Sequence, residues 1–365
     1  MHAAITRPAA NSVARDGASR DGGCRDTVFR GTTSPGAAAF RLQRRWGQLP
    51  WERSLRRGAL AAVMVLSCTG AWAAELAGPG VIWRLRQGAG WVYVAGSMHG
   101  LPATRSTLPA TYVRAYAAAA RLVMEIDLKS TSPAELAEEL LRRGLQDGGG
   151  TLSTDLGPQR WRQLQPLLKS AGLTPELAEP LKPWAVALML ASGQLLRSGY
   201  GGENGVEAQL QARAAADRKP VTGLETASVQ LGLLAGLPLS DQLALLDQAI
   251  AEQEPLPRRL NELETAWRLG DLATLERLAL ANDGSTPGVR AVLLDRRNSH
   301  WLPPIESFLQ QPDNTLVVVG AAHLLGDGGL IALLRRRGLV VERVLDEGRL
   351  PPAAPAGAGP ATLAP

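Results

Sequence analysis

The stretch TLVVVGAAH, residues 315–323, carries the pattern that decides the fold. Its first five residues are apolar or β-branched without interruption, which is typical of a strand covered on both faces in a parallel sheet. Gly320 then permits a sharp turn, and His323 follows three residues later. A second segment, VYVAGSMH at 92–99, has the same order of strand, glycine and histidine. We therefore expect strands from opposite ends of the chain to present His99 and His323 at one edge of a sheet.

The other sheet-forming segments also lie toward the two ends. A hairpin is predicted over 81–87 and 91–94, a buried strand over 121–126 and a last strand over 339–344, while the middle offers one short strand, 219–224. A flexible loop is expected over 199–205. Helices are expected over 109–120, 133–143, 158–170, 175–181, 183–197, 206–217, 229–234, 241–253, 258–269, 272–280, 289–308 (with a break near Pro303) and 329–337. These elements predict an α/β fold with a split core sheet built from N- and C-terminal segments and a large helical insert as a cap.

Residues 1–73 differ in composition from the rest of the chain. They carry eleven Arg and four acidic residues, a surplus of +7, whereas the remainder has a net charge of −2. The net charge of +5 for the whole chain therefore says nothing about nucleic acid. Because the remainder has no basic stripe with interleaved aromatic residues, we expect no nucleic-acid partner.

The same region contains the features of a secretory signal peptide. Arg53, Arg56 and Arg57 precede a short apolar run, 58–66, and small residues follow at 71–73. The run is shorter than the roughly 20 residues that span a bilayer, so no transmembrane span is expected in the mature chain. We expect cleavage after residue 73 or 74, and a periplasmic or secreted protein. Residues 1–45 and the Pro/Ala-rich tail, 348–365, are expected to be disordered, which leaves one domain over 74–347.

Both cysteines, Cys24 and Cys68, lie in the leader. A mature chain without thiols cannot use disulfides, thiolate catalysis or Cys-ligated zinc. Lipid attachment at Cys68 is a weaker alternative, because residues 65–67, Val-Leu-Ser, fit the lipoprotein motif poorly. The chemistry therefore falls to histidines, carboxylates, hydroxyls, lysines and arginines.

Three strand ends supply a set of candidate metal ligands. His99 and His323 follow two strands, and Glu125 lies at the end of a third. Two imidazoles and one carboxylate with open positions are typical of a catalytic metal site. The alternative is that each histidine is an ordinary turn residue. His300, the remaining histidine after the leader, is expected on a helix surface.

Further motifs follow in a fixed order. They are Leu181-Lys182-Pro183-Trp184, Gly205-Val206-Glu207, the segment KPVTGLET at 219–226, WRLGD at 267–271 and Arg297-Asn298. With the two Gly-x-x-His turns and Glu125, this set resembles the TraB/GumN family, which includes the Tiki proteins, over residues 81–345. The resemblance implies a split α/β core and metal-dependent peptidase chemistry, with Mn or Co as the usual ion; the residues themselves also allow Zn. Glu207 stands where the family usually carries Asp, which makes it a doubtful member of the site.

The roles of individual residues stay open at this point. Glu125 is either a third ligand or a general base. Arg297 is a candidate catalytic residue that would pair with a substrate carboxylate or stabilise an oxyanion, or else a helix-surface charge. Glu225 is either a ligand or an anion at a helix N-terminus, and the part played by Asn298 is undecided. Ser97 lacks the turn that surrounds nucleophilic serines.

The sequence therefore predicts an exported metal-dependent hydrolase, a metallopeptidase acting on peptide or amide bonds. Its divalent ion (Mn, Co or Zn) would be held by His99, His323 and Glu125, and its substrate would be a peptide or small molecule. One alternative is a non-enzymatic periplasmic protein that sequesters a peptide or small ligand. Another is a metal-independent esterase that uses a His/Glu pair.

Overall fold

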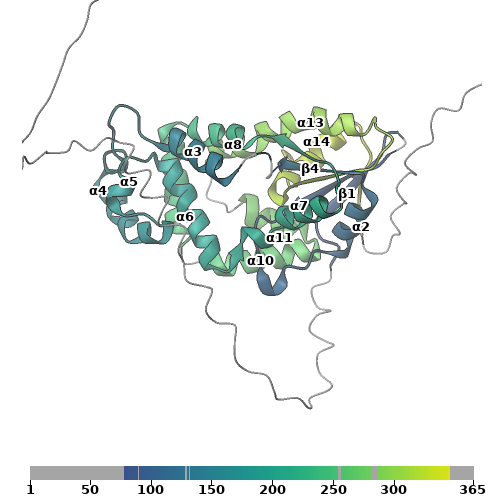
Figure 1. Ribbon diagram of the computed structural model, residues 1–365, viewed down its shortest axis with the longest axis horizontal. Helices are drawn as coiled ribbons and strands as arrows, with labels where there is room; N and C mark the ends of the chain where they lie inside the picture. The colour runs from purple at the N-terminus through teal and green to yellow at the C-terminus, as the bar shows by residue number, and fades with distance from the viewer. Residues whose placement is uncertain are drawn as a thin grey trace, which may run out of the picture. The chain divides into compact units, whose positions relative to one another are not determined.

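The computed structural model describes residues 78–345, apart from 89, 128–129, 131, 254–255 and 282–285 (Figure 1). The described residues all belong to the second of two units into which the chain divides, Ser67–Pro365. The predicted disordered leader, signal peptide and tail lie outside the described residues, as do Cys24 and Cys68.

One six-stranded sheet forms the centre of the described unit. Its strand order is β6 (Val221–Glu225), β4 (Arg121–Ile126), β7 (Thr315–Gly320), β2 (Val92–Ser97), β1 (Ile82–Leu85) and β8 (Val341–Arg343). The first four strands run parallel, and β1 is antiparallel to both of its neighbours. The predicted hairpin is therefore β1 and β2, and the predicted α/β class is confirmed.

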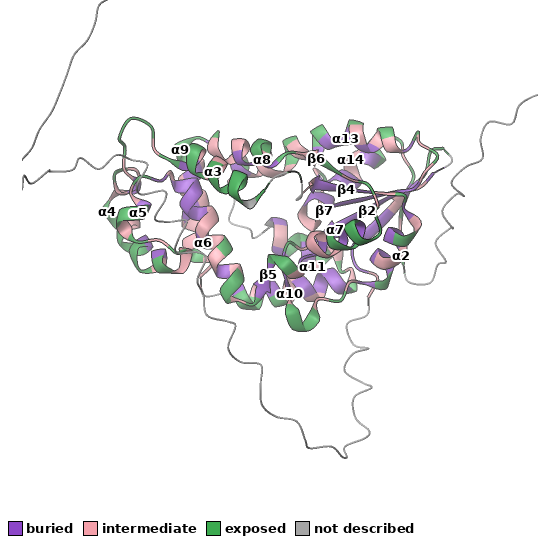
Figure 2. Cartoon of the chain, viewed as in Figure 1, coloured by how far each residue is buried: buried purple, intermediate pink, exposed green. Residues whose placement is uncertain are grey.

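Strand β7 joins the two ends of the chain. It pairs with β2 on one side, from Val92 opposite Thr315 to Ser97 opposite Gly320, and with β4 on the other. All three strands are buried along almost their whole length (Figure 2). Because they are parallel and in register, their carboxyl ends meet at the same edge. The split core sheet is confirmed, and its geometry places three predicted site segments side by side.

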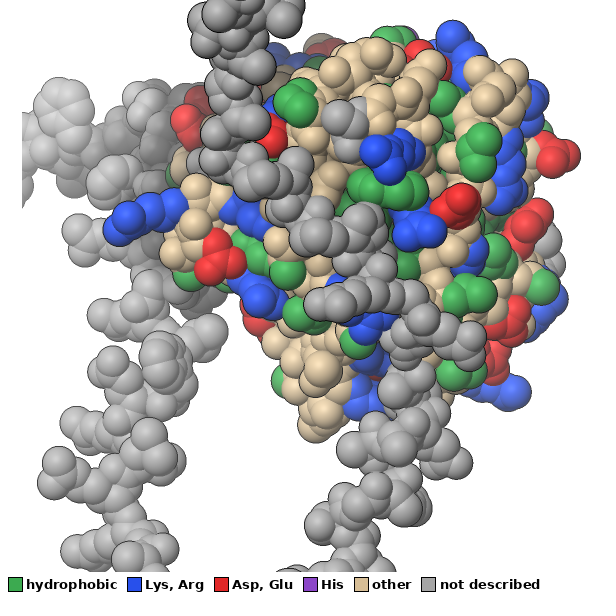
Figure 3. Space-filling view, turned by 90° about the vertical axis from the view of Figure 1, so that its right-hand side faces the viewer, with side chains coloured by type: hydrophobic (Ala, Val, Ile, Leu, Met, Phe, Trp, Pro, Cys, Tyr) green, Lys and Arg blue, Asp and Glu red, His purple; other side chains and the backbone are tan. Residues whose placement is uncertain are grey.

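Helices cover both faces of this sheet. In Figure 1, α13 (Arg296–Phe308) and α14 (Leu330–Arg336) lie on one side, and α2 (Ala110–Ala118) and α7 (Val206–Ala216) on the other. One apolar core combines the strands with residues from these helices, including Tyr112, Leu210 and Trp301. On the face in Figure 3, basic and acidic side chains lie interspersed.

The helical insert has apolar cores of its own. One contains Leu164, Leu190 and Leu246, and another is built around Trp184. The remaining helices are α3 (Pro133–Gly144), α4 (Leu152–Leu168), α5 (Pro175–Ala178), α6 (Pro183–Arg197), α8 (Ala227–Ala235), α9 (Leu239–Ala251), α10 (Leu256–Leu269), α11 (Leu272–Glu276) and α12 (Pro287–Arg290). Among the described residues no single helix is long and apolar enough to cross a membrane, and the one pair with suitable length and composition, α8 with α9, bends by 104°.

Two local predictions were wrong. The expected break near Pro303 is absent, because α13 continues through Pro303 and Pro304. The carbonyls that lose a helical partner there belong to Ser299 and His300, which are exposed to solvent. The irregularity lies earlier, in a π-helical turn over Ala291–Asp295. The segment predicted as a flexible loop contains a short strand, β5 (Tyr200–Gly201), paired with β3 (Leu101–Pro102).

Candidate functional site

The three predicted ligands converge around Gly320. A methyl group on this residue would lie 3.2 Å from Glu125 Oε1, 3.6 Å from His323 Cδ2 and 3.7 Å from His99 Nε2. The Gly320 N–H also donates a 2.6 Å hydrogen bond to Glu125 Oε1. The glycine therefore leaves open the space beside the two imidazoles and the carboxylate, which a side chain would occupy.

His323 is buried and neutral. Its Nδ1 lies 2.7 Å from Oδ1 of Asn298, and an amide oxygen only accepts, so Nδ1 carries the proton and Nε2 the lone pair. Burial lowers the pKa of His323 to about 4, and nearby Arg297 lowers it further, against the opposing effect of Glu125. The ring also packs on Trp301, with 4.5 Å between centroids. At neutral pH His323 is therefore uncharged, and its Nε2 carries a lone pair that is able to bind a cation.

His99 has a carboxylate partner instead. Its Nδ1 lies 2.7 Å from Glu207 Oε1, which also accepts a 2.5 Å hydrogen bond from Ser97 Oγ. The charge of Glu207 and this hydrogen bond raise the pKa of His99 above its usual range. Water reaches the ring, whose side chain is 70% exposed, and weakens the attraction. The other oxygen of Glu207 is covered and has no hydrogen-bond partner in the described part of the chain.

Arg297 ties two carboxylates together. It donates from Nη2 to Glu125 Oε2 at 2.5 Å and to Glu225 Oε1 at 2.6 Å, and its Nη1 lies 3.0 Å from His323 Nε2. Gln230 bridges the same two carboxylates, at 3.2 Å and 2.7 Å. The Arg297 side chain is 11% exposed, so Arg297 is not the surface charge that its helical position also allowed.

Glu125 stays ionised in this surrounding. Burial alone would raise its pKa, but the positive charges of His323, His99 and Arg297 and the Gly320 N–H lower it to about 2. His323 adds to this effect only when it is protonated, so at neutral pH the charges of His99 and Arg297 and the Gly320 N–H keep the pKa of Glu125 low. The site therefore contains a carboxylate that is able to bind a cation or accept a proton at neutral pH.

The donor set fits a divalent ion in type and in tautomer. Each histidine has an acceptor oxygen on Nδ1, the arrangement that directs Nε2 at a metal. His323 Nε2 and Glu125 Oε1 are 3.7 Å apart, and bond lengths of about 2.0–2.2 Å let two donors of one ion lie up to about 4 Å apart. In the described residues, however, no three such side chains are grouped closely enough to hold an ion as they stand. Arg297 uses the His323 lone pair, and it would have to release that contact.

The sequence identified most of this cluster. His99, Glu125, His323, Arg297 and Glu225 come together, and His300 is exposed outside the cluster. Glu207 and Asn298, left in doubt by the sequence, are the Nδ1 partners of the two histidines. Sequence reasoning missed Gln230 and Trp301, since a glutamine and a tryptophan on helices carry no motif.

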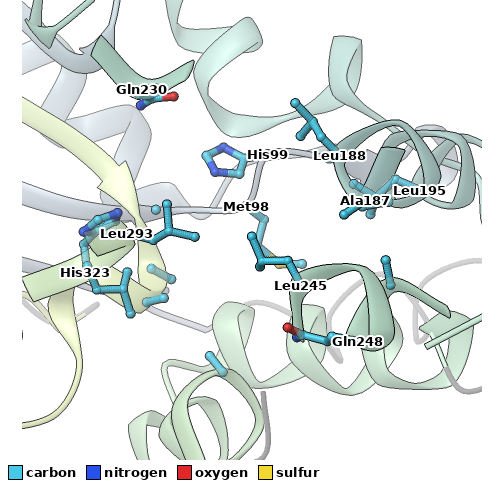
Figure 4. A pocket seen from close by; sticks show the side chains of 18 of the residues that line it. Met98, His99, Ala187, Leu188, Leu195, Gln230, Leu245, Gln248, Leu293 and His323 are labelled. Atoms are coloured by element: carbon cyan, nitrogen blue, oxygen red, sulfur yellow. The ribbon is translucent and has the colours of Figure 1, made fainter. Parts of the chain in front are cut away.

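A cavity of about 630 Å³ opens beside the cluster. His99, His323 and Gln230 lie on it (Figure 4). The remaining lining comes mostly from apolar side chains of the helical insert, such as Leu188 and Leu245. This volume is within the range of small-molecule sites, about 300–1,000 Å³.

Comparison with known proteins agrees with the motif order. The chain is 28% identical over 243 residues, 67% of its length and 87% of the relative's, to the protein named uncharacterized protein YbaP of Escherichia coli (strain K12), and equally to that of Shigella flexneri. No solved structure matches the chain. The model of the TraB/PrgY/gumN family matches residues 81–343, and the chain therefore belongs to that family.

Proposed function

We propose that this chain is an exported metal-dependent hydrolase that cleaves peptide or amide bonds. One observation carries the proposal: two imidazoles with Nδ1 held by Glu207 and Asn298 converge, at the carboxyl ends of adjacent strands, on an ionised carboxylate. Carboxyl ends of parallel strands are where α/β folds place their ligands. A purely structural role would not need both histidines to hold Nδ1 on an acceptor oxygen, which leaves Nε2 of each ring for a ligand.

His99 and His323 would hold the ion (Mn, Co or Zn), with Glu125 as a third ligand or as the general base. The ion would polarise the scissile carbonyl and acidify a bound water. Glu125 remains unprotonated at neutral pH, so it suits either role. Arg297 lies beside it and is placed to orient the carboxylate or to stabilise negative charge on the substrate.

The test compares single variants of the purified protein. His99→Ala and His323→Ala should lose bound metal, because an ion needs several donors in fixed geometry. Glu125→Gln keeps the size but removes the charge, and should lose hydrolysis by at least about a hundredfold. Metal content is measured by mass spectrometry and hydrolysis with a peptide mixture. If Glu125→Gln keeps its metal, the residue is the base; if it loses both, the residue is a ligand.

His300→Ala is the control, because this exposed side chain lies outside the cluster. Full metal content and unchanged hydrolysis in both His99→Ala and His323→Ala would contradict the metal-site proposal. Hydrolysis by protein stripped of metal would instead favour an esterase that uses the His/Glu pair.

A second candidate is a non-enzymatic binding protein for a peptide or small ligand. It is favoured by the contacts of Arg297, which occupy Glu125, Glu225 and the lone pair of His323. A protein that binds ligand tightly with neither metal nor turnover would fit it.

A further inference from the structure

The cavity beside the histidines has two chemically different parts. Its floor is the polar cluster with His99, His323 and Arg297. Its walls come mostly from helices α6, α8, α9, α10 and α11 and from the π-helical turns Arg277–Ala281 and Ala291–Asp295. A ligand that fills the cavity must therefore match a polar floor at one end and the helical walls along the rest of its length.

The walls are apolar and incompletely covered. Leu188, Leu234, Leu245 and Leu263 line them and are only half-buried. Figure 4 shows Leu188 and Leu245 around the space that His99 faces. Apolar surface of this kind, lining a hollow beside a polar cluster, is typical of a ligand site rather than of a solvent-facing helix.

Several polar groups on the walls are already engaged. Gln230 donates to Glu125 and Glu225, and Glu252 accepts from Arg259 and lies 3.5 Å from Gln248. The indole N–H of Trp184 has no partner among the described residues, but it is covered by neighbouring atoms. The wall helices use their own backbone groups in helical hydrogen bonds. A peptide main chain inside would leave groups unpaired, at about 1–3 kcal/mol each, whereas an aliphatic chain has none to satisfy.

We propose that the cavity binds an aliphatic chain whose carbonyl end lies at His99 and His323, so that the substrate is a fatty amide or ester. The role of the carbonyl rests on the proposed hydrolase function, but binding of the chain does not. Leu and Ala side chains would contact the methylenes, and the helical walls would exclude water from them.

The experiment is calorimetric titration of the purified chain with hexanamide, octanamide and decanamide. Affinity should rise about fifteenfold at each step, since each added methylene contributes about 0.8 kcal/mol. Leu245→Gln, which puts an amide on the wall, should weaken decanamide binding about tenfold or more. Leu196→Gln is its control, because Leu196 is 64% exposed and does not line the cavity. Ala191→Trp should block the longest amide while Ser192→Trp, exposed on the same helix, should not.

Affinity that does not depend on chain length would overturn the inference, as would unchanged binding in Leu245→Gln and Ala191→Trp. Tighter binding of acetyl-leucyl-alanyl-leucine amide than of decanamide would replace the aliphatic chain by a peptide. Hydrolysis assays on the unchanged protein, run beside the same titration, separate the two proposals. Chain-dependent binding without hydrolysis refutes only the hydrolase, and hydrolysis of peptides without chain dependence refutes only this inference.

Discussion

Two histidines in equivalent turns differ in charge because burial dominates at one and a carboxylate at the other. His323 is buried beside a neutral amide, and its pKa falls to about 4. His99 faces a carboxylate, Glu207, and its pKa rises. At neutral pH His323 has a lone pair on Nε2, whereas His99 must lose a proton before its Nε2 is able to bind a cation. We therefore expect metal uptake to increase with pH.

Replacing Glu207 tests this assignment. In metal-free protein, Glu207→Gln should lower the pKa of His99 toward about 6.5, because the carboxylate that favours the charged ring is gone. Nuclear magnetic resonance titration measures this pKa. In the unchanged protein, protonated His99 stabilises the fold below about pH 6.5, and this contribution is lost as pH rises through the raised folded pKa. Glu203→Gln, on an exposed residue nearby, should leave the titration as it was. An identical His99 titration in Glu207→Gln would contradict the assignment.

The three predicted ligands are fixed by their own strands, whereas Arg297, also predicted, comes from helix α13. His99, Glu125 and His323 each stand at the end of an apolar run, so strand register alone brings them together. Glu207, Gln230 and Asn298 come from helices, and their approach depends on how those helices pack. No local pattern encodes that packing, so the hydrogen-bond partners stayed in doubt or were missed.

At the scale of elements, helix α7 positions His99 through a close backbone approach. A methyl group on Gly205, the residue before the helix, would lie 2.1 Å from the carbonyl oxygen of His99. The next N–H, of Val206, donates to the Met98 carbonyl at 3.1 Å. The start of α7 thus holds the turn after β2, and it carries Glu207 within reach of the imidazole.

Gly205→Ala should therefore disturb both stability and the site. Overpacking against a backbone carbonyl costs about 1–3 kcal/mol, which urea unfolding measures, and displacement of His99 should reduce metal content as well. Gly150→Ala is a matched control on an exposed loop, where the added methyl group meets only ordinary contacts, 3.5 Å or longer. We expect it to stay within about 0.5 kcal/mol of the parent. Equal effects of the two substitutions would argue against a positioning role for Gly205.

The elements predicted best are those with an uninterrupted pattern. Strand β4 and helix α6 have the predicted bounds, because an apolar run and a proline-led amphipathic stretch each allow one solution. Pro303 misled the prediction because its cost depends on whether the freed carbonyls reach water, a tertiary property. The pairing of β5 with β3 is likewise long-range, so residues 199–205 alone suggested only a loop.

At the scale of the whole chain, export is a prediction that the described residues leave open. It rests on Arg53, Arg56 and Arg57, the apolar run 58–66 and the small residues at 71–73. Mass spectrometry of the native protein should find a start at Ala74 or Glu75. Retention of 53–57 in the mature protein would contradict export by this signal. A diacylglyceryl mass on Cys68 would support lipid anchoring instead.

Folding of the insert should depend on strands far away in sequence. Strand β7 lies between β2 and β4, and β6, which interrupts the insert, is the next strand beyond β4. The helices are therefore tied to the sheet at their ends and in their middle.

Leu316→Ala, at a position with no exposure, should cost about 2–5 kcal/mol, lowering the unfolding midpoint of the whole unit. Circular dichroism, dominated by the helices, and tryptophan fluorescence should give one coincident transition. Val340→Ala, at a side chain 69% exposed, should change little. A second, separate transition in either signal would mean that the insert and the sheet unfold independently, and that the site is assembled from two independent parts.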